Sequence, residues 1–121
     1  MDLERAMPIY AADIVSFDLD PPLQYVGKEA KRKRWVSVFS MYQSLRDYEI
    51  RDLTVTVGDD VAYGHSLNRI SGTLTNGDSA ELWLRWTTGL RKIDGHWLIA
   101  HEQLSVPADP RSGKALLNLK P

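Results

Sequence analysis

Hydrophobic and polar positions follow a helical period in one main stretch of this 121-residue chain. Four large apolar residues there are spaced i, i+3, i+4 and i+7, which is the stripe of a helix that packs on a core. The stripe comprises Trp35, Val38, Phe39 and Tyr42. Residues 1–10 show the same spacing over a shorter length. The pattern therefore predicts one long helix that opens at Gly27 and a short N-terminal helix.

Strand-like composition and alternation dominate the chain after residue 46. The pattern predicts strands over residues 13–18, 23–26, 47–57, 61–74, 80–93 and 96–106. Turn-forming sequences separate the later strands, and they are Gly58-Asp59-Asp60, Asn76-Gly77-Asp78 and Asp94-Gly95. A change of apolar phase at Arg51-Asp52 predicts a β-bulge. Successive hairpins of this length predict an antiparallel sheet that twists and curls.

The striped helix and the curled sheet together predict the fold class. A helix with an apolar stripe has to bury that stripe, and the concave side of the sheet is the available surface. We expect a cone-shaped α+β fold in which a strongly curved antiparallel sheet wraps around one long helix, with a ligand pocket between them. We expect a single domain over residues 1–107 and a C-terminal tail over residues 108–121.

Charge and composition narrow the functional classes. The net charge of −1 gives no overall field that would hold nucleic acid or an anionic membrane. The basic cluster 31–34 lies in the predicted helix, and we interpret it as a solvated helix face with two exposed side chains rather than a nucleic-acid patch. The absence of cysteine excludes disulfides and thiolate metal sites. No apolar run approaches the ~20 residues of a membrane span, and we expect a soluble cytoplasmic protein.

Three segments carry a resemblance to a known family. They are Tyr-Ala-Ala-Asp-Ile-Val-Ser-Phe-Asp at 10–18, Gly-Lys-Glu-Ala at 27–30 and the hairpin sequence at 90–102. In order and spacing they resemble SnoaL-like and ketosteroid-isomerase-like proteins of the nuclear transport factor 2 superfamily, over about residues 6–107. The resemblance implies a usually dimeric cone-shaped fold. Its pocket serves isomerisation, cyclisation, hydrolysis or dehydration in some members and only association in others. It also implies a longer first helix than this sequence provides.

Asp18 is the first candidate for chemistry, because it matches the position of the isomerase's general-base aspartate. A carboxylate at the mouth of an apolar cone would have a raised pKa, which suits proton abstraction near neutral pH. The alternative is an aspartate that ends a strand ahead of Pro21-Pro22. The isomerase's second oxyanion-hole donor, a protonated acid, has no counterpart at residues 87–90, so steroid isomerisation is not expected.

His101 is the second candidate, since an imidazole in the same cone could act as base or donor near pH 7. The alternative is a structural strand histidine. We predict Asp18 and His101 as catalytic residues. The predicted substrate-binding residues are His65, Arg85, Gln103, Trp35 and Phe39. For Arg85, a place on the outer sheet face, beside Trp83 at a dimer contact, is an equal alternative.

Two hypotheses for function follow. The first is an acid–base enzyme without metal or cofactor that acts on a small hydrophobic molecule. The second is a non-catalytic ligand-binding or association module. They differ in whether Asp18 and His101 share one enclosed pocket. In both cases we expect a homodimer through the convex face of the sheet, because Trp83, Leu84 and Trp86 in succession would leave large apolar groups on both faces.

Overall fold

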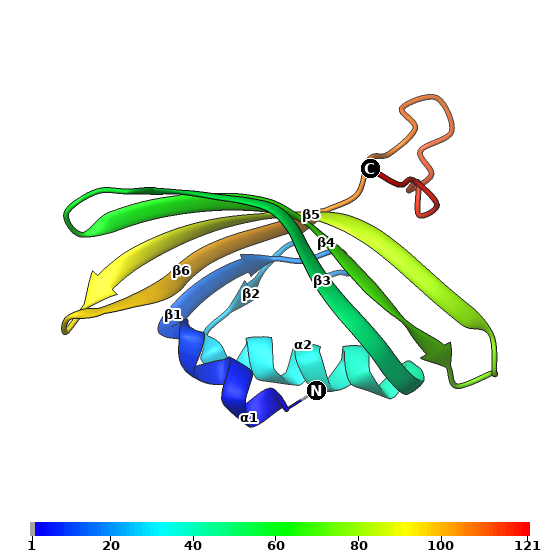
Figure 1. The fold of residues 1–121 in the computed structure, drawn as a ribbon, viewed down its shortest axis with the longest axis horizontal. Coiled ribbons are helices and arrows are strands. Elements are labelled where there is room, and N and C mark those ends of the chain that lie inside the picture. Colours follow the sequence, from blue (N-terminus) through cyan, green and yellow to red (C-terminus); the bar gives the residue numbers. More distant parts are fainter. Residues whose placement is uncertain (1) are drawn as a thin grey trace.

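Six strands form one curved sheet that arches over the helices (Figure 1). The structure is a computed structural model and describes residues 2–121. The elements in chain order are α1 (Leu3–Ala6), the 3-10 turn η1 (Met7–Ile9), β1 (Tyr10–Phe17), β2 (Tyr25–Val26), α2 (Lys28–Ser40), β3 (Tyr42–Val57), β4 (Val61–Leu74), β5 (Ser79–Ile93) and β6 (His96–Ser105). None of the helices within these residues is long and apolar enough to cross a membrane.

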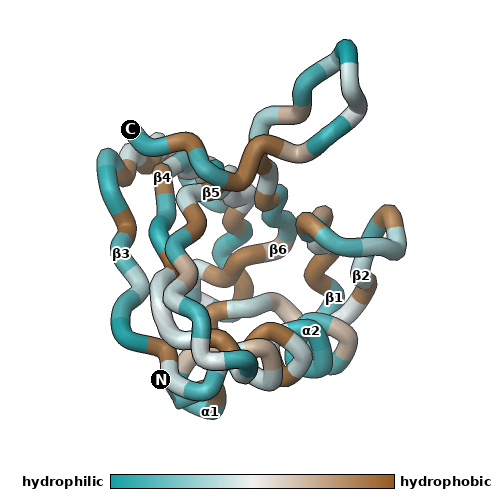
Figure 2. The backbone as a smooth tube through the Cα atoms, turned by 90° about the vertical axis from the view of Figure 1, so that its right-hand side faces the viewer, coloured by the Kyte–Doolittle hydropathy of each residue, from teal (hydrophilic) through white to brown (hydrophobic). Residues whose placement is uncertain are grey.

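The order of the strands places segments from the start and the end of the sequence side by side in the sheet. The sheet runs β2-β1-β6-β5-β4-β3, and every neighbouring pair is antiparallel except β1 and β6, which are parallel. The first long strand therefore lies beside the last one. The tail after β6 leaves the sheet as a separate loop, closed by a bridge between Ala108 and Ala115 (Figure 2).

The predicted α+β class and the curved sheet are confirmed, but the single long helix is not. Helix α2 has 13 residues and ends at Ser40. Tyr42 opens β3, so it does not belong to the helical stripe as predicted. The helix ends before Met41, and the chain continues directly into β3. Tyr42 is the first residue of that strand, and it stands at i+7 from Trp35 only by coincidence. Trp35, Val38 and Phe39 are half-buried rather than fully buried.

Register shifts interrupt several of the strand pairs, and two of them bear on the predictions. The predicted one is present in β3, where the register with β4 shifts between Arg51 and Thr54 and Asp52 adopts a φ of 56°. The second lies between β5 and β6. Gly89 pairs with His101, but the next residue, Leu90, pairs with Ile99. The intervening Ala100 is the extra residue of a β-bulge, and such a residue reverses the face on which the following side chains lie.

The apolar core is small and lies where η1, β1 and β6 meet. Its buried members are Met7, Tyr10, Ile14 and Ile99, with Leu3, Trp35, Trp86 and Leu90 packed against them. The Trp35 indole N–H donates to the Tyr10 hydroxyl over 3.1 Å, which ties α2 to β1. Several other fully buried side chains are polar. They include Ser16, Lys31, Asn68 and Glu102.

Candidate functional site

A cavity of about 440 Å³ lies between α2 and the concave side of the sheet. Every long strand from β3 to β6 contributes to its wall, and the tail closes one side. The apolar part of the lining comprises Leu19, Trp35, Val38, Met41, Ile70, Leu82, Leu84, Leu104, Val106, Ala115 and Leu117. The polar part comprises Asp18, Asp20, Lys31, Arg34, Tyr42 and Tyr48. The charged groups gather at the end where α2 meets the loop after β1.

Lys31 is the centre of a buried ion network beside this cavity. Its side chain is only 2% exposed, and its ammonium lies 2.6 Å from Glu102 Oε2 and 3.2 Å from Asp18 Oδ2. Glu102 also accepts hydrogen bonds from the Ser16 hydroxyl over 2.8 Å and from the Trp86 indole N–H over 2.9 Å. Each carboxylate oxygen of Glu102 thus has a donor, which is what a buried charge requires.

Asp18 forms the cavity side of the network. Its Oδ1 accepts the backbone N–H of Leu19 over 2.7 Å, and Arg34 Nε lies 3.4 Å from its Oδ2. Burial by itself would raise the pKa of Asp18, but the charges of Lys31 and Arg34 and the Leu19 hydrogen bond outweigh it and hold the pKa below the ordinary 3.8. The predicted raised pKa is therefore wrong, because the end of the cone that holds Asp18 is cationic rather than apolar.

Arg34 lies on the same helix face, one turn beyond Lys31. Its Nη1 is 3.3 Å from Oδ2 of Asp20, a half-exposed residue in the loop between β1 and β2. Two side chains of the basic cluster were expected to be exposed, and Lys33 is exposed and Arg32 partly exposed. The other two, Lys31 and Arg34, are buried. The prediction that the cluster forms one solvated face is therefore wrong for these two.

The spacing of the two buried cations carried a signal that the sequence analysis missed. Lys31, Arg34, Trp35 and Val38 stand at i, i+3, i+4 and i+7, so they share one helix face. All four line the cavity. Two cations on the face that packs on a core require buried carboxylates, and Glu102, within the last predicted strand, was available as a partner.

A chain of neutral hydrogen bonds reaches the cavity from the sheet. The Ser66 hydroxyl donates to Asn68 Oδ1 over 2.7 Å, and Asn68 Nδ2 donates to the Tyr48 hydroxyl over 2.8 Å. Burial raises the pKa of Tyr48, so this phenol is protonated at neutral pH. Because the Tyr48 oxygen accepts from Asn68, its own proton is available to donate to a bound molecule.

Asp18 lies at the cavity and His101 does not. Glu102 pairs with Ser16 on the inner face, so the flanking residues His101 and Gln103 lie on the outer face of β6. The His101 Nδ1 is 2.7 Å from the Val15 carbonyl oxygen, and its ring meets Phe17 edge-on at 4.7 Å. The two residues predicted as a catalytic pair are therefore on opposite sides of the sheet.

The predicted substrate-binding residues divide in the same way. Trp35 lines the cavity, whereas Phe39 packs against Trp35 with ring centroids 5.6 Å apart and does not line it. His65 is exposed on β4 next to the buried Gly64 and Ser66, which places it on the outer face. Gln103 is exposed as well.

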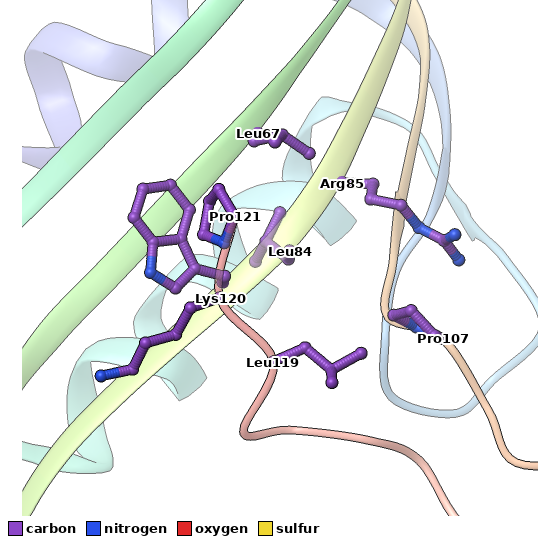
Figure 3. A pocket seen from close by; sticks show the side chains of 8 residues that line it. Leu67, Leu84, Arg85, Pro107, Leu119, Lys120 and Pro121 are labelled. Carbon is purple, nitrogen blue, oxygen red and sulfur yellow. The ribbon is translucent and has the colours of Figure 1, made fainter.

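Arg85 lies in a separate shallow groove on the outer face of the sheet (Figure 3). The groove measures about 160 Å³, and Leu67, Trp83 and the tail residues Leu119 and Pro121 share it. Arg85 Nε donates to Ser105 Oγ over 3.0 Å. The outer-face alternative for Arg85 therefore agrees with the structure. Residues 2–121 contain no cluster of three or more His, Asp or Glu side chains that could hold a metal ion.

Comparison with known proteins agrees with this architecture. An NTF2-like protein of unknown function from Pseudomonas putida KT2440 is 36% identical, with a TM-score of 0.87, over 99% of this chain and 83% of that one. A ketosteroid isomerase-like protein from Erwinia carotovora atroseptica is 24% identical, with a TM-score of 0.71, over 86% of this chain and 80% of that one.

A putative scytalone dehydratase from Novosphingobium aromaticivorans is 14% identical, with a TM-score of 0.72, over 85% of this chain and 69% of that one. At this identity the likeness concerns the fold alone. No curated protein matches the chain. The SnoaL-like domain profile matches residues 1–109. The chain therefore belongs to the SnoaL-like domain family, within the nuclear transport factor 2 superfamily.

Proposed function

We propose that this protein binds a small, mainly apolar molecule in the cavity between α2 and the sheet. The supporting observation is the cavity itself, which at about 440 Å³ falls in the ~300–1,000 Å³ range of small-molecule sites. Its wall is mostly apolar, with a few polar groups at one end that would orient a ligand. The separation of His101 from Asp18 removes the predicted acid–base pair, so binding is the function that the geometry supports best.

Filling the cavity from the helix tests this proposal. Val38 lines the cavity, whereas Val36, on the same helix, is 52% exposed and does not. We expect Val38→Trp to weaken binding of the neutral fluorescent probe N-phenyl-1-naphthylamine by about tenfold or more, because the indole occupies the ligand's space. Val36→Trp is the matched control and should leave the affinity unchanged. Fluorescence titration of both variants measures the effect.

The result that contradicts the proposal is equally specific. If both tryptophan variants bind the probe as the wild type does, the probe binds elsewhere on the surface. If the folded wild type does not bind the probe at all, the cavity does not take apolar molecules of this size. Circular dichroism of each variant establishes that the fold is retained.

Proton transfer by Asp18 is the second candidate function. The observation that favours it is an ionised carboxylate in the lining of a mostly apolar cavity, together with the free hydroxyl proton of Tyr48 in the same lining. A phenol can polarise a carbonyl while a carboxylate removes a neighbouring proton. No metal or cofactor takes part in this scheme. His101 has no role in it, because its ring lies on the other face of the sheet.

We also propose that two copies of the chain associate through the convex face of the sheet. Of the three apolar residues on which the dimer was predicted, Leu84 and Trp86 lie on the inner face of the sheet, and Trp83 lies on the outer face. Trp83 stacks against the guanidinium groups of Arg51 at 4.6 Å and Arg69 at 5.9 Å. Val61 and Tyr63 extend the exposed surface of β4 on the same side. Aromatic and arginine side chains are the residues that most often anchor interfaces.

Light scattering at micromolar concentration tests the proposed dimer. We expect a mass of about twice the 13.7 kDa of one chain. Tyr63→Glu should shift the population toward the monomer, because it places a carboxylate in each copy of the contact. A mass of one chain for the wild type would contradict the dimer.

A further inference from the structure

The guanidinium group of Arg34 is poorly satisfied for a buried charge. The side chain is 7% exposed, and its Nε has no hydrogen-bond partner among residues 2–121. The carboxylate contacts are long: 3.4 Å and 3.5 Å to Asp18 and 3.3 Å to Asp20. Charge-assisted N–H···O bonds usually measure about 2.7–2.9 Å. Arg34 lines the cavity and therefore retains capacity for a better-placed acceptor.

Asp20 shows which kind of acceptor the site tolerates. It places a carboxylate against Arg34, it also lines the cavity, and its side chain is 51% exposed. A half-exposed ion pair contributes little to stability, so Asp20 can turn to water at small cost. Asp18 differs because it is buried and also bound by Lys31. A ligand would therefore displace Asp20 and leave the Lys31–Asp18 pair intact.

We infer that the ligand of this cavity is a small hydrophobic carboxylate whose acid group replaces Asp20 on Arg34. The inference rests on the proposed function and adds the class of ligand. The two cations Lys31 and Arg34 balance the two buried carboxylates, Asp18 and Glu102. When Asp20 turns to water, its negative charge leaves the site, and the carboxylate of the ligand replaces that charge. The planar guanidinium group binds both oxygens of a carboxylate, which a neutral ligand cannot match.

A pair of ligands of the same shape tests the inference. We choose 2-naphthoic acid, which is ionised at pH 7.5, and 2-naphthamide, which is neutral, and measure both by isothermal titration calorimetry at low salt. The wild type should bind the acid about tenfold more tightly than the amide, the effect of one additional charged contact. Arg34→Met should abolish this preference.

Two further variants distinguish binding at Arg34 from a nonspecific effect of the protein's charge. Asp20→Asn removes the competing carboxylate, and it should tighten binding of the acid by about threefold or more relative to the amide. Arg32→Met is the matched control. Arg32 lies on the other side of α2, where it pairs with Glu4, so this variant should keep the wild-type ratio of the two affinities.

The outcomes distinguish this inference from the proposed function. Equal affinity of the wild type for acid and amide overturns the inference and leaves the binding function in place. The inference is also overturned if Asp20→Asn does not tighten binding of the acid relative to the amide. This variant tests the inference even if Arg34→Met does not fold. If neither naphthalene ligand nor N-phenyl-1-naphthylamine binds, the proposed function fails and the inference fails with it.

Discussion

Replacement of Lys31 by methionine is expected to lower the free energy of unfolding by about 3–5 kcal/mol at pH 7. The methionine keeps most of the side-chain volume but removes the ammonium that bridges Glu102 and Asp18. Two buried carboxylates would then face each other without their shared cation, and Glu102 is only 1% exposed. Urea unfolding followed by circular dichroism measures the loss.

Two controls make this result specific to the buried charge. Lys33→Met, on the exposed side of the same helix, should change stability by less than about 0.5 kcal/mol. The double change Lys31→Met, Glu102→Gln should recover part of the loss, because it removes one of the uncompensated charges. If Lys31→Met unfolds at the same urea concentration as Lys33→Met, the network does not stabilise the fold.

Asp18→Asn is expected to reduce turnover by about 10²-fold or more on any substrate that reacts in this cavity. The asparagine keeps the size of the side chain and its contact with the Leu19 N–H but cannot accept a proton. Steady-state kinetics of both forms measure the effect. Asp13→Asn is the matched control, because Asp13 lies in β1, the strand that leads to Asp18, but pairs with Arg91 at an exposed site. Undiminished turnover in folded Asp18→Asn leaves the protein as a binding module.

The pH profile follows from the lowered pKa of Asp18. A base is active when deprotonated, and Lys31 and Arg34 hold the pKa of this carboxyl below 3.8 against the effect of burial. The rate that depends on Asp18 should therefore stay level from pH 5 upward and fall only below about pH 4. A midpoint near pH 6 in the wild type that disappears in Asp18→Asn would contradict this electrostatic account.

Patterns of apolar residues and turn signals were sufficient to predict the α+β class and most strands. The strand at 61–74 and the turn at Asp94-Gly95 agree with the structure, because alternation and turn chemistry are local properties. The end of α2 was not predictable in this way. The spacing of Tyr42 fits a helix as well as a strand start, and only the pairing of Tyr42 with Leu74 decides between them.

The candidate site was less predictable, because it depends on contacts between distant segments. Asp18 was found through its place in the family pattern. Lys31 and Arg34 were missed because lysine and arginine are rarely buried, and Glu102, the partner of Lys31, lies about seventy residues further along the chain. The prediction that His101 lies in the cone is wrong because of one unpaired residue in β6. The bulge at Ala100 turns Glu102 toward the helix and His101 away from it, and nothing in the local sequence marks that bulge.

The parallel pairing of β1 with β6 also determines when the site can exist during synthesis. Ser16 and Lys31 leave the ribosome well before Glu102, which binds both. Until β6 has been made, Lys31 has no buried carboxylate from the sheet, and the cavity lacks the wall that Leu104 and Val106 supply. Closing a loop of this length has an entropic cost that only the completed sheet offsets. A nascent or truncated chain without its last strand therefore has no binding site.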